Sequence, residues 1–366
     1  MIRTLRWLHL YGALVLAVPL LLLFVSGIAL VYKNDFWRWQ HPELGAPLPE
    51  LSAAGHAAAI ERMEEMFDAG VGLVKYPQPD LSAYHVWLAD GTEALVDPRT
   101  LEIIDHWAWW QRPTAVLAEM HLHLFADETG SEVIGWIGLA LVFLLISGAI
   151  VWWPLRRLFR WNSLVPRSTS RGRLLMFHRN LGVITLPIAL LLIAAGTGVA
   201  FFQPARVMLN AMFGDTVSQP LASRPARQSP EGSEQPLRAL LETAEQRLPA
   251  GRITFVYPDL AGTGVLMIRK KMPGEPHPNG LSFVHIDIGS GKPLAVTDGE
   301  NAPPGDRLAN WLYPLHSGKW GGRAWQLVVL LNGLLLIIML VAGVLAWLRK
   351  PRAPEKSRSV RHSPAA

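Results

Sequence analysis

Four long apolar runs constrain this chain more than any other feature of its sequence. They cover residues 10–32, 133–153, 174–202 and 324–348. Each reaches the roughly 20 residues that a helix needs to cross a hydrocarbon core of about 30 Å. None carries a charged side chain in its central part. Half of the 366 residues are apolar as well, which is unusual for a soluble enzyme of this length. The sequence therefore predicts an integral membrane protein with four spanning helices in contact with the lipid bilayer.

The basic residues lie largely in three short segments that flank these runs. Arginine and lysine gather before the first run, between the second and third, and after the fourth. The positive-inside rule then places both termini and the middle loop in the cytoplasm. These flanks also account for the net charge of +5, so we expect no nucleic acid partner. The first run is long for a signal peptide and no small-residue cleavage pattern follows it, so we expect it to remain as an anchor.

This topology predicts an all-α four-helix bundle in the membrane, joined to two small α+β domains on the extracytoplasmic side. The predicted segments are residues 1–32 (N-terminus and first span), 33–132 (first outer domain), 133–153 (second span), 154–173 (basic cytoplasmic loop), 174–202 (third span), 203–323 (second outer domain), 324–348 (fourth span) and 349–366 (basic cytoplasmic tail). A Pro-rich and Ser-rich tract at residues 219–235 has the composition of a linker.

The two halves of the chain repeat one another. Each outer domain shows a helix followed by four strand-like stretches: a helix at 53–67 with strands at 71–76, 83–88, 93–96 and 101–104, and a helix at 235–248 with strands at 252–257, 264–269, 281–288 and 293–296. The spans repeat with matched spacings: His9 to Gly27 equals His178 to Gly196, and His121 to Gly148 equals His316 to Gly343. We therefore predict two tandem units, each made of helix, α+β domain and helix.

The matched histidines predict two cofactor sites. His9 and His178 stand at the cytoplasmic heads of parallel spans, and His121 and His316 precede the other two spans on the outer side. An imidazole pair on facing helices is how a bundle holds a low-spin haem. The chain has no cysteine, which excludes covalent haem attachment, disulfides and thiolate-held metal. Two non-covalent b-type haems, one toward each membrane face, are the prediction.

Nearby small and basic residues fit the same prediction. Arg6, Arg179, Lys319 and Arg323 are close enough in sequence to meet haem propionates. Glycines in the spans would give room to a flat macrocycle; they are Gly12, Gly27, Gly148, Gly182, Gly196 and Gly343. Small residues are also common wherever membrane helices pack closely, and a histidine at a helix head is often only interfacial.

The positions of His121 and His316 require that the helix be interrupted before the second and the fourth span. A continuous helix rises about 1.5 Å per residue, so 27 residues would carry His121 far above the hydrocarbon. We expect breaks near residues 127–130 and 318–322 that return the histidines to the membrane surface. His123 is an alternative outer ligand in the first unit, although the repeat favours His121.

Several short motifs give the sequence a family resemblance. They are Trp7-Leu8-His9-Leu10-Tyr11-Gly12, Met120-His121-Leu122-His123-Leu124-Phe125, Trp152-Trp153-Pro154, Phe177-His178-Arg179-Asn180-Leu181-Gly182, and Leu315-His316-Ser317-Gly318-Lys319-Trp320-Gly321-Gly322. In order and spacing the chain resembles the PepSY-associated transmembrane helix proteins of bacterial inner membranes over almost its whole length. There are two departures: Gly12 follows its histidine by three residues where Gly182 follows by four, and Met120 stands where the second unit has Leu315.

The resemblance implies periplasmic PepSY-like domains and, in some members, ferric-siderophore reduction with b-type haems. The expected activity is therefore outer-sphere electron transfer to a ferric siderophore or other Fe(III) chelate, with no catalytic acid or base. The electron donor is expected to be a separate cytoplasmic reductase or a membrane quinol. Two other functions stay open: a non-enzymatic membrane regulator that binds peptides or proteases, and a small-solute or metal permease. The spans lack the acidic residues that usually mark ion pathways, which weighs against the permease.

Overall fold

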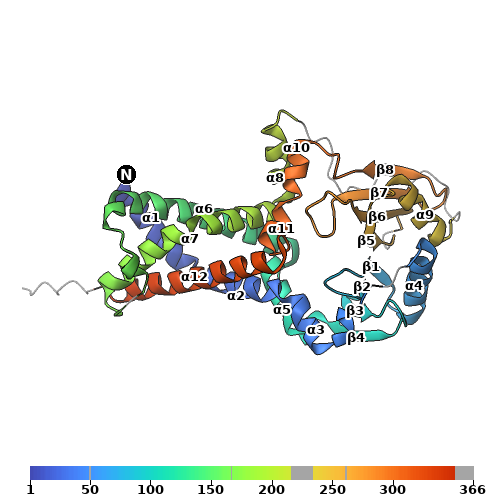
Figure 1. The fold of residues 1–366 in the computed structure, drawn as a ribbon, viewed down its shortest axis with the longest axis horizontal. Coiled ribbons are helices and arrows are strands. Elements are labelled where there is room, and N and C mark those ends of the chain that lie inside the picture. The colour runs from blue at the N-terminus through green and yellow to red at the C-terminus, as the bar shows by residue number, and fades with distance from the viewer. Residues whose placement is uncertain (49–50, 166, 216–233, 260–261, 351–366) are drawn as a thin grey trace, which may run out of the picture.

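The computed structural model describes residues 1–48, 51–165, 167–215, 234–259 and 262–350. Figure 1 shows an elongated molecule with a bundle of helices at one end and a β-sheet domain at the other. The N-terminus and the last described residues lie at the same end of the bundle, remote from the sheet. All but the last two residues of the predicted linker at 219–235 fall outside the described residues, as does the predicted tail beyond Lys350.

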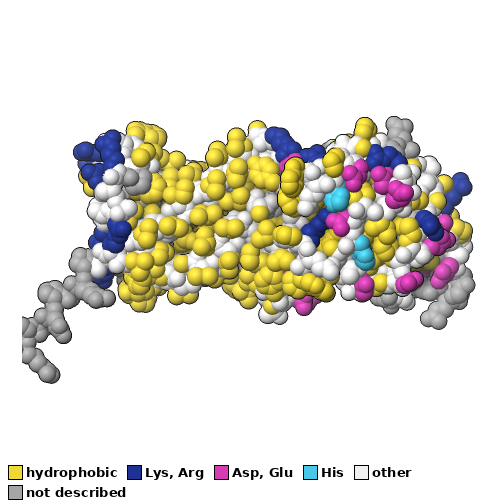
Figure 2. Space-filling model, turned by 90° about the horizontal axis from the view of Figure 1, so that it is seen from below, with side chains coloured by type: hydrophobic (Ala, Val, Ile, Leu, Met, Phe, Trp, Pro, Cys, Tyr) yellow, Lys and Arg dark blue, Asp and Glu magenta, His cyan; other side chains and the backbone are white. Residues whose placement is uncertain are grey.

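Among the described residues, three helices are long and apolar enough to cross a membrane: α6 (Asp127–Trp152, continued by η3, Trp153–Leu158), α7 (Arg171–Ala200) and α12 (Gly322–Leu348). A bent pair, α1 (Ile2–Val15) and α2 (Ala17–Val31), is a fourth span if both helices are taken together. Helix α7 packs against α6 and α12, α12 also packs against α2, and α1 packs against α6. Hydrophobic side chains cover the outside of these helices, while Lys and Arg gather at the end opposite the sheet (Figure 2). The chain is therefore a membrane protein with several apolar helices.

The first apolar run is not one straight helix, as the sequence alone suggests. Helices α1 and α2 meet at Leu16 with a bend of 62°. Pro19 lies in the first turn of α2, where its missing N–H is tolerated, but its ring would clash with the carbonyl of Val15 in a continuous helix. The bend separates the segment that carries His9 from the segment that carries Gly27.

A break between two helices precedes both α6 and α12, as the spacing of the histidines requires. Helix α5 (Pro113–His123) is followed by positive φ at Leu124, Phe125 and Asp127, so this break starts three residues before the predicted residues 127–130 and extends to the first of them. Helix α11 (Leu312–His316) is followed by positive φ at Gly318, Gly321 and Gly322, within the predicted residues. Helix α5 turns back to pack against α2, and α11 packs against α7. Each outer histidine therefore lies beside the bundle instead of above it.

The outer segments share one antiparallel sheet of eight strands in the order β4-β3-β2-β1-β5-β6-β7-β8. The strands of the first unit are β1 (Val71–Lys75), β2 (Tyr84–Leu88), β3 (Thr92–Val96) and β4 (Ile103–Ala108); those of the second are β5 (Arg252–Tyr257), β6 (Val265–Lys271), β7 (Ser282–Asp287) and β8 (Pro293–Thr297). Helices α4 (Ala53–Met66) and α9 (Leu237–Arg247) cover one face and enclose the largest hydrophobic core. They lie on the side of the sheet remote from the bundle (Figure 1).

Short helices connect the sheet to the bundle. They are α3 (Lys33–Gln40), η1 (Pro42–Gly45) and η2 (Trp109–Gln111) in the first unit, and α8 (Phe202–Ala211) and α10 (Pro304–Ala309) in the second, while η4 (Trp161–Leu164) lies in the loop between α6 and α7. Helix α10 packs against α8, where Arg206 forms a buried ion pair with Asp306. These connections fix the sheet over the end of the bundle that carries His121 and His316.

Candidate functional site

The structure brings the four predicted histidines together as two pairs. His9 of α1 and His178 of α7 have ring centres 6.3 Å apart, with ring planes at 75°. His121 of α5 and His316 of α11 have ring centres 6.1 Å apart, with planes at 22°. The first pair, here called the inner pair, lies toward the basic end of the bundle, and the second, the outer pair, lies toward the sheet. Each pair takes one histidine from each unit.

A glycine faces every one of these imidazoles. A Cβ atom built on Gly148 would lie 3.1 Å from Cε1 of His9, and one built on Gly27 would lie 3.0 Å from Cε1 of His121. In the second unit, Gly343 faces His178 at 3.1 Å (Nδ1) and Gly196 faces His316 at 2.4 Å (Cε1). Each histidine therefore rests on the glycine of the other span of its own unit. These four glycines make room for imidazole rings, whereas the sequence alone suggested room for a macrocycle.

The second-unit histidines are oriented by backbone carbonyls. Nδ1 of His178 lies 2.8 Å from the carbonyl oxygen of Met339, and Nδ1 of His316 lies 2.9 Å from that of Leu192. A carbonyl can only accept, so Nδ1 carries the proton in both rings. Nε2 is then the bare nitrogen, and it has no hydrogen-bond partner among the described residues. This is the state in which an imidazole can bind a metal.

The first-unit histidines contact a serine hydroxyl in addition to the corresponding backbone carbonyl, that of Leu144 for His9 and that of Leu23 for His121. Nδ1 of His9 lies 3.0 Å from Oγ of Ser147, and Nδ1 of His121 lies 3.0 Å from Oγ of Ser26. Each hydroxyl donates its own hydrogen to a backbone carbonyl, of Leu144 for Ser147 and of Leu22 for Ser26. The hydroxyl oxygen must therefore accept from Nδ1–H, which again leaves Nε2 bare. Sequence reasoning missed both serines, although each directly precedes a glycine that it had singled out.

A cavity of about 1100 Å³ opens beside the inner pair. Its walls are apolar side chains of α1, α6, α7 and α12, together with His9 and His178. Arg6 and Arg179, both predicted to meet an anionic cofactor group, line it. Further cations lining it are Arg160, Arg167, Arg171, Arg173 and Lys350. The cavity thus combines an apolar interior, two imidazoles and several basic groups.

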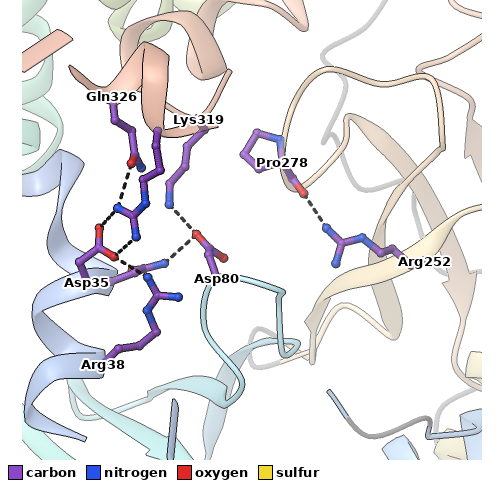
Figure 3. Close-up of polar contacts among 9 residues, drawn as sticks. Asp35, Arg38, Asp80, Arg252, Pro278, Lys319 and Gln326 are labelled. Carbon is purple, nitrogen blue, oxygen red and sulfur yellow. Dashed lines mark hydrogen bonds and ion pairs between the residues drawn. The ribbon is translucent and has the colours of Figure 1, made fainter. Parts of the chain in front are cut away.

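Lys319 and Arg323 are placed differently from the prediction. Nζ of Lys319 lies 2.5 Å from Oδ2 of Asp80, and Arg323 donates to both carboxylate oxygens of Asp35 at 2.5 Å (Figure 3). These two ion pairs join the start of α12 and the segment before it to the first outer segment, and we call them the clasp. His123 is also turned to a carboxylate, with its Nδ1 2.9 Å from Oε2 of Glu119. The structure therefore does not bring these three residues to a ligand position.

The sheet face opposite α4 and α9 carries a row of alternating cations and rings. Lys75, Phe255, Arg269 and Phe283 are direct neighbours on adjacent strands. The amino group of Lys75 lies 5.8 Å from the Phe255 ring centre, and the Arg269 guanidinium lies 5.7 Å from Phe255 and 5.6 Å from Phe283. Lys75 makes no hydrogen bond or ion pair with any described residue. Burial, followed by the nearby charge of Lys33, lowers the pKa of Lys75 to about 8.

Comparisons with known proteins agree with this architecture. The model of one family, described as the PepSY-associated TM region, matches residues 6–350. A comparison with curated proteins finds no match. The family match starts before His9 and ends after Gly343, so it includes all four histidines and their glycines, and it confirms the resemblance noted in the sequence. The chain therefore belongs to the PepSY-associated transmembrane family.

Proposed function

We propose that this protein is a transmembrane di-haem oxidoreductase that reduces a ferric chelate, such as a ferric siderophore, on the side of the sheet. The observation that carries the proposal is the presence of two cross-unit histidine pairs with ring centres 6.3 and 6.1 Å apart and a bare Nε2 on every ring. In this proposal the basic end of the bundle faces the cytoplasm of a bacterial cell and the sheet lies in the periplasm.

The residues present fit a haem at each pair. Two Nε2 atoms at about 2 Å from a metal between them place the ring centres about 6 Å apart, as in both pairs. Each pair would supply two imidazole nitrogens to the haem iron. At the inner pair the cavity offers apolar walls for the ring, and Arg6 and Arg179 can bind its propionates. Lys319 and Arg323 are engaged by the clasp, so we assign them no cofactor contact.

Each b-type haem, when bound, would supply an iron that takes up and releases one electron. The protein's own part is to hold Nε2 of each histidine toward the site through the Nδ1 bond and the facing glycine. Apolar side chains of the spans keep water from the inner site. No side chain is needed as an acid or base at the chelated iron, because its reduction takes up an electron and no proton; the protons of the quinol or reduced flavin donor are released at the basic end.

The reaction balances as one electron for each iron released. A reduced flavoprotein or a quinol is oxidised at the basic end, and Fe(III) of the chelate is reduced to Fe(II) at the sheet end. Hard oxygen ligands hold the softer Fe(II) less strongly, so the iron leaves and the chelator stays intact. The arginines around the inner cavity would attract an anionic face of such a donor.

An absorption spectrum of the purified full-length protein tests the proposal. We expect a Soret band, and α-bands that appear on reduction with dithionite. His178→Ala should remove one haem and His316→Ala the other, since each pair depends on both of its rings. A folded, colourless preparation that contains no haem would contradict the proposal and favour a regulator that only binds peptides. Unchanged haem content in both variants would contradict the pairing.

A further inference from the structure

The two units differ at the residue before each facing glycine. The first unit has Ser26 before Gly27 and Ser147 before Gly148. The second unit has alanine at the equivalent positions, Ala195 and Ala342. Both serines are almost completely buried, at 0% and 1% exposed. Because each histidine pair draws one ring from each unit, each pair contains one imidazole that contacts a serine hydroxyl besides a backbone carbonyl and one that contacts a backbone carbonyl alone.

We propose that Ser147 and Ser26 are positioning residues that set the reduction potentials of the inner and outer haems separately. The assignment rests on the proposed haem function. Ser147 bonds only to the inner ring His9, and Ser26 bonds only to the outer ring His121. Each serine thus acts on one redox centre through one axial ligand.

The physical basis is the chain of hydrogen bonds from the ring to the backbone. Nδ1–H of the imidazole donates to the serine oxygen, and the same hydroxyl donates to a carbonyl, at 3.0 Å for Ser147 and 2.7 Å for Ser26. Donation at one end of such a chain strengthens acceptance at the other. An imidazole that donates from Nδ1 becomes a more basic ligand at Nε2, and a more basic ligand stabilises Fe(III) relative to Fe(II). The serines therefore lower the potentials of their centres.

Because both serines are buried, no other group can easily take the place of their hydroxyls. No solvent reaches Ser26 or Ser147, so a water molecule cannot substitute for a lost hydroxyl without a new cavity. Removing the hydroxyl either leaves Nδ1–H with the backbone carbonyl as its one acceptor, as in the second unit, or displaces the ring. Both results change the ligand on one iron only.

Redox titration of the full-length protein in detergent, followed in the Soret band, tests the assignment. We expect two waves, and in Ser147→Ala we expect the inner wave to move to higher potential. A tenfold change in the one-electron equilibrium constant corresponds to about 59 mV and is the expected size. Ser26→Ala should move only the outer wave, so each variant is the control for the other. The waves are assigned from His178→Ala and His316→Ala.

A reciprocal variant supplies a matched gain of function. Ala342→Ser places a hydroxyl beside Gly343, where the ring of His178 lies, and so adds a second acceptor to the Met339 carbonyl; it should move the inner wave in the direction opposite to Ser147→Ala while the outer wave stays. Loss of the inner haem alone in Ser147→Ala would also support the assignment, because haem affinity depends on the same bond. Waves that move together, or do not move, would overturn it.

A measurement without haem separates this inference from the proposed function. In protein labelled with ¹⁵N-histidine and freed of cofactor, Ser147→Ala should shift the ring nitrogens of His9 and leave those of His121 in place. Unchanged His9 resonances would overturn the serine assignment even if haem is bound. An absence of haem from the parent protein would instead refute the oxidoreductase, whatever the ¹⁵N result.

Discussion

At the scale of single residues, the contact between each imidazole and a glycine sets the tightest limit on the sequence. The distances from a Cβ atom added to the glycine range from 2.4 Å at Gly196 to 3.1 Å at Gly148 and Gly343. Real Cβ atoms rarely approach other atoms so closely, and the ring cannot retreat because its Nδ1 is bonded on the same helix. A methyl group at these positions must therefore displace a histidine.

Gly196→Ala should displace His316 and disrupt the outer pair. The added methyl would overlap the ring at 2.4 Å, which is well inside van der Waals contact. We expect loss of the outer haem with retention of the inner one, measured by pyridine haemochrome content and by the number of redox waves.

Gly12→Ala is the matched control, since its Cβ would lie at an ordinary 3.5 Å from Leu144. This variant should keep both haems. Equal haem loss in Gly12→Ala and Gly196→Ala would show that the spans tolerate no added methyl at all, and would remove the special role of the imidazole contact.

His56 should make the outer domain less stable in acid. Its Nδ1 lies 2.7 Å from Tyr84 Oη and its ring stacks on Tyr76, and burial lowers its pKa to about 4. The unfolded chain binds a proton near pH 6.5 and the folded chain does not, so stability is lost as the pH falls from about 6.5 toward 4. The slope is at most about 1.4 kcal/mol per pH unit. Thermal unfolding of parent and His56→Phe between pH 7 and pH 5 measures it, and an equal slope in both would contradict the assignment.

The sequence was sufficient to select the four histidines, because their spacing repeats in both units. It was insufficient to decide what each one touches. The pairing of His9 with Gly148, and of His121 with Gly27, depends on how two spans pack, and no pattern within one span records that contact. A long side chain such as that of Lys319 can reach several partners, and its partner in the structure, Asp80, lies far away in the sequence.

At the scale of elements, the breaks before α6 and α12 determine where the outer histidines lie. A Cβ on Gly130, in the first turn of α6, would overlap the carbonyl oxygen of His123 at the end of α5. The two helices therefore meet in a tight turn. After α11, three glycines with positive φ take the place of this turn, and the clasp holds the same segment from outside.

The Lys319–Asp80 pair of the clasp should contribute more to stability than the Arg323–Asp35 pair. The Lys319 side chain is 24% exposed, whereas that of Arg323 is 64% exposed. Exposed ion pairs contribute about 0–1 kcal/mol, and shielding from water raises the value within that range. Double-mutant cycles with Lys319→Gln and Asp80→Asn, and with Arg323→Gln and Asp35→Asn, should give the larger coupling for the first pair. A larger coupling for the second would contradict this ranking.

The elements were predictable where local chemistry decides them. The breaks follow from glycines and from the length of helix that a membrane accepts, and α4, α9 and the strands follow from apolar periodicity. The bend at Leu16 was missed because a proline within an apolar run is also compatible with a continuous helix, as Pro187 in α7 shows. The strand predicted at 101–104 begins instead at Ile103, since Leu101 has positive φ and belongs to the turn.

At the scale of the whole molecule, the row of cations and rings predicts the charge of the acceptor. The unpaired amino group of Lys75 favours an anionic chelate as the proposed acceptor. Lys75→Gln should weaken binding of a redox-inert gallium(III) catecholate severalfold, measured by quenching of tryptophan fluorescence. In the parent, affinity should fall as the pH rises through about 8, because Lys75 then loses its charge, and the variant should lack this dependence.

Lys292→Gln is the matched control, because Lys292 is a lysine in the turn before β8, away from the row. It should bind the complex as the parent does. Equal weakening in both variants would indicate a general effect of net charge, and tighter binding of a cationic hydroxamate complex would contradict the predicted anionic class.

The joint between the two units has a consequence for how the molecule is assembled. At the middle of the sheet, Val74 pairs with Val256 and Lys75 pairs with Phe255. The repeated Tyr-Pro dipeptide that follows makes Val74 equivalent to Phe255 and Lys75 equivalent to Val256. The contact is therefore reciprocal, as in a dimer of identical subunits around a two-fold axis. Each unit places its two histidines against its own glycines, but each histidine pair needs a ring from both units. One unit therefore corresponds to one subunit of a symmetric dimer, and the two subunits are joined in a single chain.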